Sequence, residues 1–159
     1  MAQINIALNV DNLTPGKAYA IAKKCGQAIP ELEDLIATKR DTAYKYALNI
    51  LKGRFIKGEA IILTDVNLTY WYTENVIKER WLEAEAVIMK SPQEAVWYAR
   101  HFIKGRWLEA EQYIKKSAME ASMYARTVMD ERWLEAEDII KNGGTTIWWL
   151  AYCEYFNIK

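Results

Sequence analysis

The sequence predicts an all-α protein, an α-solenoid of about five two-helix repeats of 26 residues with atypical N- and C-terminal caps. The first observation is the hexapeptide RWLEAE, which begins at Arg80, Arg106 and Arg132, each 26 residues after the last. The second is that an isoleucine and a tyrosine recur in fixed registers of the same period. These residues are Ile36, Ile62, Ile88, Ile114 and Ile140, then Tyr46, Tyr72, Tyr98 and Tyr124, with Leu150 in the last tyrosine place. Three identical six-residue strings at one interval do not arise by chance, so the repeat organises the chain.

Each repeat is expected to form two short helices. In the repeat that starts at Arg80, apolar residues including Trp81 and Ile88 share one face of a first helix over about 81–90. A second helix over about 93–103 carries an apolar stripe that includes Tyr98. Helices this short are marginal alone, because nucleation is costly and packing must stabilise them. Neighbouring repeats must therefore stack in a row.

The helix boundaries carry capping signals. Ser91 with Glu94 fits the S-x-x-E capping box, and Ser117 with Glu120 repeats it. A glycine follows the second helix in two repeats, where a left-handed closing residue is expected. These glycines are Gly53 and Gly105.

The two ends differ from the repeats within one predicted domain. Residues 1–27 are expected to form an N-terminal cap, including a helix that starts near Thr14. Residues 28–141 hold the repeats, and residues 142–159 form a C-terminal capping helix after a Gly-Gly pair. The aromatic residues of that last helix predict a lid over the end of the array.

Composition excludes several classes of protein. The chain has 159 residues, 52% of them hydrophobic, which allows a real core and argues against disorder. Lys and Arg number 21, as do Asp and Glu, so the net charge is zero. A balanced chain is a poor candidate for extended nucleic acid, because that affinity depends on phosphate neutralisation.

Cysteine and hydropathy patterns predict a cytosolic protein. Cys25, Cys153 and the single His101 cannot form a tetrahedral zinc site without carboxylates, so neither a metal nor a cofactor is expected. The first ten residues lack the features of a signal peptide, and no apolar stretch is long enough to span a bilayer. No membrane partner is therefore expected.

The string YAR…IKGRWLEAE…I resembles short tandem repeats found in uncharacterised proteins of phages and of bacteria with phage-derived genes. The usual string there is close to YAxxVIKGRWPEAEPYI, and the resemblance covers about residues 38–141. Leu82, Leu108 and Leu134 stand where that family has Pro, whereas Pro30 occupies the equivalent place in the earliest repeat. The resemblance implies a helical repeat and a phage-like origin, and it carries over no catalytic residues.

Recurring Arg and Glu residues are interpreted as a structural ladder between layers rather than as catalytic groups. A catalytic carboxylate pair needs two distinct environments, whereas repetition produces equivalent ones. No nucleophile motif, phosphate loop or metal motif appears, so an enzyme is not predicted. The ladder residues are Arg54, Arg80, Arg106, Arg132, Glu85, Glu111 and Glu137.

Positions that vary within the constant frame are the candidate binding residues. They lie on the second helix, opposite its apolar stripe, and combine Trp with Arg and Lys, which is typical of interaction hot spots. They are Trp71, Trp97, Arg100, Lys104, Arg126, Trp149 and Tyr152. The alternative is that some of these tryptophans pack against the next layer.

The leading hypothesis is a non-enzymatic phage protein that binds and inhibits a host defence protein through this second-helix surface. A second hypothesis is a sponge that sequesters a nucleotide-type immune signal, with Trp stacking on the base and Arg on the phosphate. A third is a structural or assembly protein, including a homo-oligomer whose ends stack.

Overall fold

A computed structural model describes residues 12–159 and contains only helices and their connections over that range. The all-α prediction is therefore confirmed. The chain divides into two compact units, one up to Thr64 and one from Asp65 to Lys159. Most of the predicted N-terminal cap segment before Thr14 lies outside the described residues.

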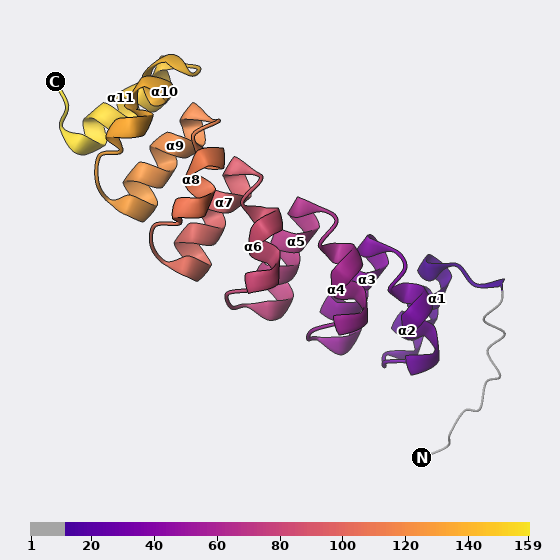
Figure 1. Cartoon of the computed structure of the whole chain (residues 1–159). Coiled ribbons are helices and arrows are strands. Elements are labelled where there is room, and N and C mark those ends of the chain that lie inside the picture. The colour runs from indigo at the N-terminus through magenta and orange to yellow at the C-terminus, as the bar shows by residue number, and fades with distance from the viewer. Residues whose placement is uncertain (1–11) are drawn as a thin grey trace. The chain divides into compact units, whose positions relative to one another are not determined.

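From residue 12 onward, the first unit holds four α-helices. They are α1 (Pro15–Cys25), α2 (Pro30–Ile36), α3 (Arg40–Tyr46), which continues as the π-helical turn η2 (Ala47–Leu51), and α4 (Ile56–Ile62). As expected, α1 begins after Thr14, whose hydroxyl oxygen accepts a hydrogen bond from the Lys17 N–H at 3.3 Å. Helices α1 and α4 both pack on α2 and α3 (Figure 1).

The second unit repeats the helix–helix pattern three times. Its elements are α5 (Val66–Tyr72) with η3 (Thr73–Ile77), α6 (Leu82–Ile88), α7 (Pro92–Tyr98) with η4 (Ala99–Ile103), α8 (Leu108–Ile114), α9 (Ala118–Tyr124) with η5 (Ala125–Met129), the 3-10 turn η6 (Leu134–Ala136), α10 (Glu137–Asn142) and α11 (Thr146–Phe156). The second helices of successive repeats pack on one another, α5 on α7, α7 on α9 and α9 on α11 (Figure 1). Outward residues of consecutive second helices are thereby brought next to each other.

A π-helical turn and a left-handed residue end the second helix of each complete repeat. At the end of η4, the N–H of Lys104 donates to the carbonyl of Ala99, five residues back, at 2.7 Å. Lys104 itself has φ of 60°. The prediction that Gly105 and Gly53 adopt the left-handed conformation is wrong, because the residue before each glycine takes that conformation at the end of the π turn. The residues at that position are Lys52, Lys78, Lys104 and Asp130.

The capping boxes form only in part. The Ser117 hydroxyl oxygen accepts from the Glu120 N–H at 3.4 Å, as expected for an N-cap. Ser91 instead donates its hydroxyl proton to the Glu94 carboxylate and does not cap the backbone. Pro92 at the first helical position has no N–H, so it leaves one fewer donor without a partner at this helix end.

Large aromatic residues hold neighbouring helices together in the core. The rings of Tyr98 and Trp107 lie 5.2 Å apart, and those of Tyr124 and Trp133 lie 5.3 Å apart. All four side chains are buried. Because each tyrosine lies on a second helix and each tryptophan precedes the following first helix, these contacts join consecutive repeats.

The tyrosine hydroxyl also joins the two helices of its own repeat. The Tyr98 oxygen accepts from the Trp81 N–H at 2.9 Å and lies 3.4 Å from Glu85 Oε1. Tyr124 repeats this with the Trp107 N–H at 2.6 Å and with Glu111. Burial raises the pKa of both tyrosines to about 12, so each hydroxyl keeps its proton. Tyr124 donates it to Glu111, and Tyr98 shares it between the Trp81 carbonyl at 3.2 Å and Glu85.

Tyr124→Phe is expected to lower the free energy of unfolding by about 1–3 kcal/mol, because it leaves the buried Trp107 N–H without its acceptor. Urea denaturation measures this loss, provided that the free energy of unfolding keeps the same slope against urea concentration in both proteins. Tyr113→Phe is the matched control, since Tyr113 is half-buried and contacts Lys116 through its ring. Equal stability of the two variants would contradict this role of the Tyr124 hydroxyl.

Leu82→Pro is expected to be tolerated or to stabilise by about 0.4–1 kcal/mol, although it introduces proline into a helix. Leu82 occupies the first helical position and is 65% exposed. The preceding Trp81 has φ −117° and ψ 96°, close to φ −128° and ψ 95° at Ile29, which precedes Pro30. Ala86→Pro, also at an exposed position but inside α6, should cost about 3 kcal/mol. If both prolines lowered the melting temperature equally, residue 82 would not be the first residue of the helix, contrary to the structure.

Candidate functional site

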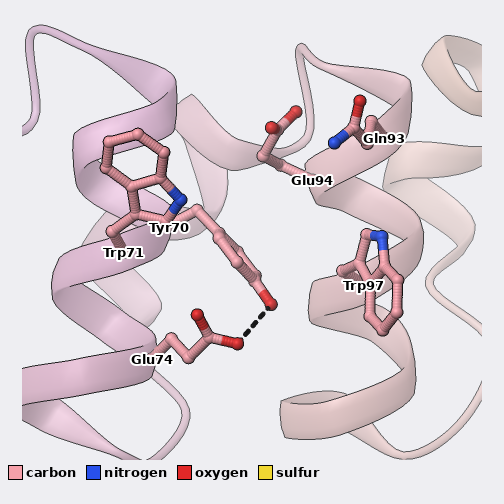
Figure 2. Close-up of a pocket in the computed structure, with 6 residues that line it drawn as sticks. All are labelled: Tyr70, Trp71, Glu74, Gln93, Glu94 and Trp97. Atoms are coloured by element: carbon pink, nitrogen blue, oxygen red, sulfur yellow. Dashed lines mark hydrogen bonds between the residues drawn. The ribbon is translucent and has the colours of Figure 1, made fainter.

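A cleft of about 210 Å³ lies between α5 and α7 in the second unit. It is lined by Tyr70, Trp71, Glu74, Gln93, Glu94 and Trp97 (Figure 2). Two of the predicted binding residues, Trp71 and Trp97, thus come together at one place. They occupy the same register of consecutive second helices, and the packing of α5 on α7 brings them to the two sides of the cleft.

Both indoles remain accessible. Trp71 is 50% exposed and Trp97 is 38% exposed, whereas Trp81, Trp107 and Trp133 are buried. The alternative that these two side chains are covered by the next layer is therefore not what the structure shows. Large aromatic side chains left half in water are typical of surfaces that bind a partner.

Trp97 is oriented by its own helix. His101, one turn later, stacks on the indole with a centroid separation of 5.1 Å and an interplanar angle of 10°. Its Nδ1 lies 3.0 Å from the Trp97 carbonyl oxygen. The guanidinium of the predicted residue Arg100 lies over the same indole, 5.9 Å from the ring centroid. The Trp97 ring is thus held in place while it still lines the cleft.

The rest of the cleft is acidic. Tyr70 donates its hydroxyl proton to Glu74 Oε1 at 3.1 Å, the bond drawn in Figure 2. Burial, and then the hydrogen bond to Glu74, raise the pKa of Tyr70 far above its usual value, so it stays neutral. Glu94 lies on α7 and accepts from the Ser91 hydroxyl. None of the six lining residues is cationic, so the cleft carries two negative charges.

The remaining predicted binding residues lie away from the cleft lining. Lys104 is exposed and forms the left-handed turn that ends η4. The Arg126 side chain is half-buried and donates from Nε to the Ser122 carbonyl in its own helix at 3.2 Å. Trp149 is half-buried, with the ammonium group of Lys141 5.7 Å from its ring centroid. These three side chains do not join Trp71 and Trp97 in one site.

Tyr152 is a correction, because it is fully buried and not a surface residue. Its oxygen accepts from the Trp133 N–H at 2.7 Å and donates to Glu137 at 3.1 Å, and burial raises its pKa to about 12. It therefore takes the tyrosine place that the fixed period assigns to Leu150, which is exposed. Tyr152 lies 19 residues after its partner whereas Tyr124 lies 17 after its own, because the connection before α11 is two residues longer.

The Arg–Glu pairs form within repeats, not between layers as the ladder interpretation expects. Arg106 donates from both Nε and Nη2 to the Glu111 carboxylate at 2.9 and 3.0 Å, and Arg132 pairs likewise with Glu137. The same five-residue spacing pairs Arg54 with Glu59 and Arg80 with Glu85. The hydrogen bond from Arg132 lowers the pKa of Glu137. Glu85, Glu111 and Glu137 also accept from the buried tyrosine hydroxyls. Each Arg–Glu ion pair therefore helps to hold together the two helices of its own repeat.

Sequence reasoning missed Tyr70, Glu74, Gln93 and Glu94 as lining residues. The sequence pattern assigns Glu94 only to a capping box. In the structure its carboxylate accepts from Ser91 Oγ, and the residue lines the cleft. Tyr70 could have been found, since its register varies as strongly as the neighbouring one. The residues there are Tyr44, Tyr70, Val96, Ser122 and Trp148.

Comparison with protein-family models, with curated proteins and with solved structures finds no match to this chain. Over residues 12–159, no group of three His, Cys, Asp or Glu side chains is arranged to hold a metal ion. None of the helices in the described part of the chain is both long and apolar enough to cross a membrane.

Glu120, one repeat after Glu94, is an unusual buried acid. It is 3% exposed, and its Oε2 has no hydrogen-bond partner. Burial, and then repulsion from Glu94, raise the pKa of its carboxyl group above its usual value. A folded-state pKa above the unfolded value means that stability falls as pH rises through this window, because the buried group must then lose its proton.

Glu120→Gln is therefore expected to raise the melting temperature at pH 7 and to leave it nearly unchanged at pH 4, where the acid already carries its proton. Glu109→Gln is the control, since Glu109 is exposed and the variant has the same net charge. Differential scanning fluorimetry at both pH values measures the effect. A lower melting temperature at pH 7 would mean that the ionised carboxylate stabilises the fold.

Proposed function

We propose that this chain is a non-enzymatic α-solenoid that binds a partner protein through the second-helix surface around Trp71 and Trp97. The observation that carries the proposal is the pair of half-exposed indoles on the two sides of one cleft. Protein interfaces are anchored by such tryptophans, because they bury a large apolar area at little cost in conformational entropy.

The repeated packing supports the solenoid part of the proposal. Within the second unit, α5, α7, α9 and α11 pack in succession, and equivalent tyrosine and tryptophan contacts recur from repeat to repeat. Such a frame keeps its packing residues constant while outward residues change to suit a partner.

The sequence resemblance suggests the context of binding. We propose that the protein is phage-encoded, acts in the cytosol of the bacterial host and inhibits a host protein such as a defence component. The nucleotide sponge is a weaker hypothesis for this cleft, because the carboxylates of Glu74 and Glu94 would repel a phosphate group.

The test is affinity capture from bacterial host lysate with the tagged full-length protein and the double variant Trp71→Ala/Trp97→Ala. We expect a stoichiometric partner with the wild type and a loss of at least tenfold with the variant, at an unchanged melting temperature. The control Leu82→Ala/Leu108→Ala truncates two exposed apolar residues outside the cleft and should retain the partner. Equal recovery by the tryptophan variant would place the binding surface elsewhere.

A further inference from the structure

The chemistry of the cleft between α5 and α7 indicates which group of a partner it receives. This inference rests on the proposed function and identifies the side chain that the surface recognises. Two properties of the cleft carry it. Among residues 12–159, these are the absence of a cation over one of its indoles and the lack of ion pairs at its two carboxylates.

Two other accessible or half-buried indoles of this protein, those of Trp97 and Trp149, already have a cation over the ring. Arg100 lies over Trp97 at 5.9 Å and Lys141 over Trp149 at 5.7 Å. The buried Trp133 has Lys115 at 5.8 Å from its ring centroid. Trp71 differs, because in the described part of the chain no ring stacks on it and no cation lies over it. It is also the most exposed tryptophan, at 50%.

The carboxylates at the cleft differ in the same way from those inside the repeats. Glu85, Glu111 and Glu137 each accept an arginine. Glu74 accepts only from the neutral Tyr70 hydroxyl, and Glu94 only from the neutral Ser91 hydroxyl, among the described residues. Two negative charges therefore face a cleft whose lining offers no positive one.

We propose that this cleft receives an arginine side chain of the partner protein. A guanidinium is planar and stacks on an indole face, here that of Trp71, while its N–H groups donate to a carboxylate, here Glu74 or Glu94. Figure 2 shows the two glutamates on opposite sides of the cleft, with the indole of Trp71 beside Tyr70 and that of Trp97 across from it. A volume of about 210 Å³ is enough for one such side chain and not for a folded segment.

The test uses nuclear magnetic resonance of the full-length, 15N-labelled protein, because the seven tryptophans give resolved indole N–H signals. The probe is the peptide acetyl-Gly-Gly-Arg-Gly-Gly-amide, and its control is the same peptide with citrulline, which keeps the shape and removes the charge. We expect the arginine peptide to shift the Trp71 and Trp97 signals with a millimolar dissociation constant. The citrulline peptide should bind at least tenfold more weakly.

Glu74→Gln/Glu94→Gln removes the two charges and should weaken arginine binding at least tenfold. Glu83→Gln/Glu109→Gln changes the net charge equally at exposed positions outside the cleft and should bind as the wild type does. Equal shifts with both peptides, no shift with either, or shifts with ADP in place of arginine would overturn the proposal. The wild-type titration decides this even where a variant does not fold.

The outcomes separate this inference from the proposed function. Loss of the captured partner in Trp71→Ala/Trp97→Ala without arginine binding would leave the binding surface correct and the arginine inference wrong. Arginine binding at the cleft together with undiminished partner capture by that variant would leave the cleft's chemistry correct and the proposed docking surface wrong.

Discussion

A buried tyrosine hydroxyl is the constraint on which each repeat depends. A phenol placed in the core must satisfy its oxygen and its proton there, since an unpaired buried polar group costs about 1–3 kcal/mol. Tyr98 does so by accepting from the N–H of Trp81, the residue before the first helix, and by donating to the Trp81 carbonyl and to Glu85, which also pairs with Arg80. The ring of the same residue packs on Trp107 of the next repeat. One side chain thus sets both the geometry within a repeat and the contact between repeats.

This internal network leaves the outer positions of the second helices free of a packing role. Consecutive second helices lie side by side, so residues of one register come to opposite sides of the space between them. Trp71 and Trp97 are such a pair, and Tyr70 with Glu74 and Glu94 completes the lining. In the next repeat, Met123 occupies the position of Trp97, and the buried Glu120 occupies the position of Glu94. The cleft therefore depends on which residues the variable positions carry, while the frame beneath it is constant.

The 26-residue repeat determines how much of the structure the sequence could predict. It predicts helix pairs and the accessible Trp71 and Trp97, because those depend on position within a repeat. Counting by 26 fails at Tyr152, since two extra residues before α11 move the buried tyrosine away from Leu150. The recurrence of Arg and Glu indicates that they pair. The 26-residue spacing alone does not determine whether an arginine pairs with the glutamate of its own repeat or of the next one. The left-handed Lys104 was missed because the π turn that precedes it has no residue signature of its own.

The contrast between the interior and the surface then has a chemical consequence. In the second unit, Glu85, Glu111 and Glu137 beside the core tyrosines are each paired with an arginine, and indoles such as Trp133 and Trp149 have a cation against the ring. At the cleft the same two kinds of acceptor occur together, an open indole face and carboxylates, and neither has a cation from the described part of the chain. Desolvating such a surface against an apolar or acidic partner would leave two charges unpaired, which is costly. A partner that supplies a guanidinium lowers that cost, because in the proposed arrangement the charge that pairs with Glu74 or Glu94 also lies over Trp71.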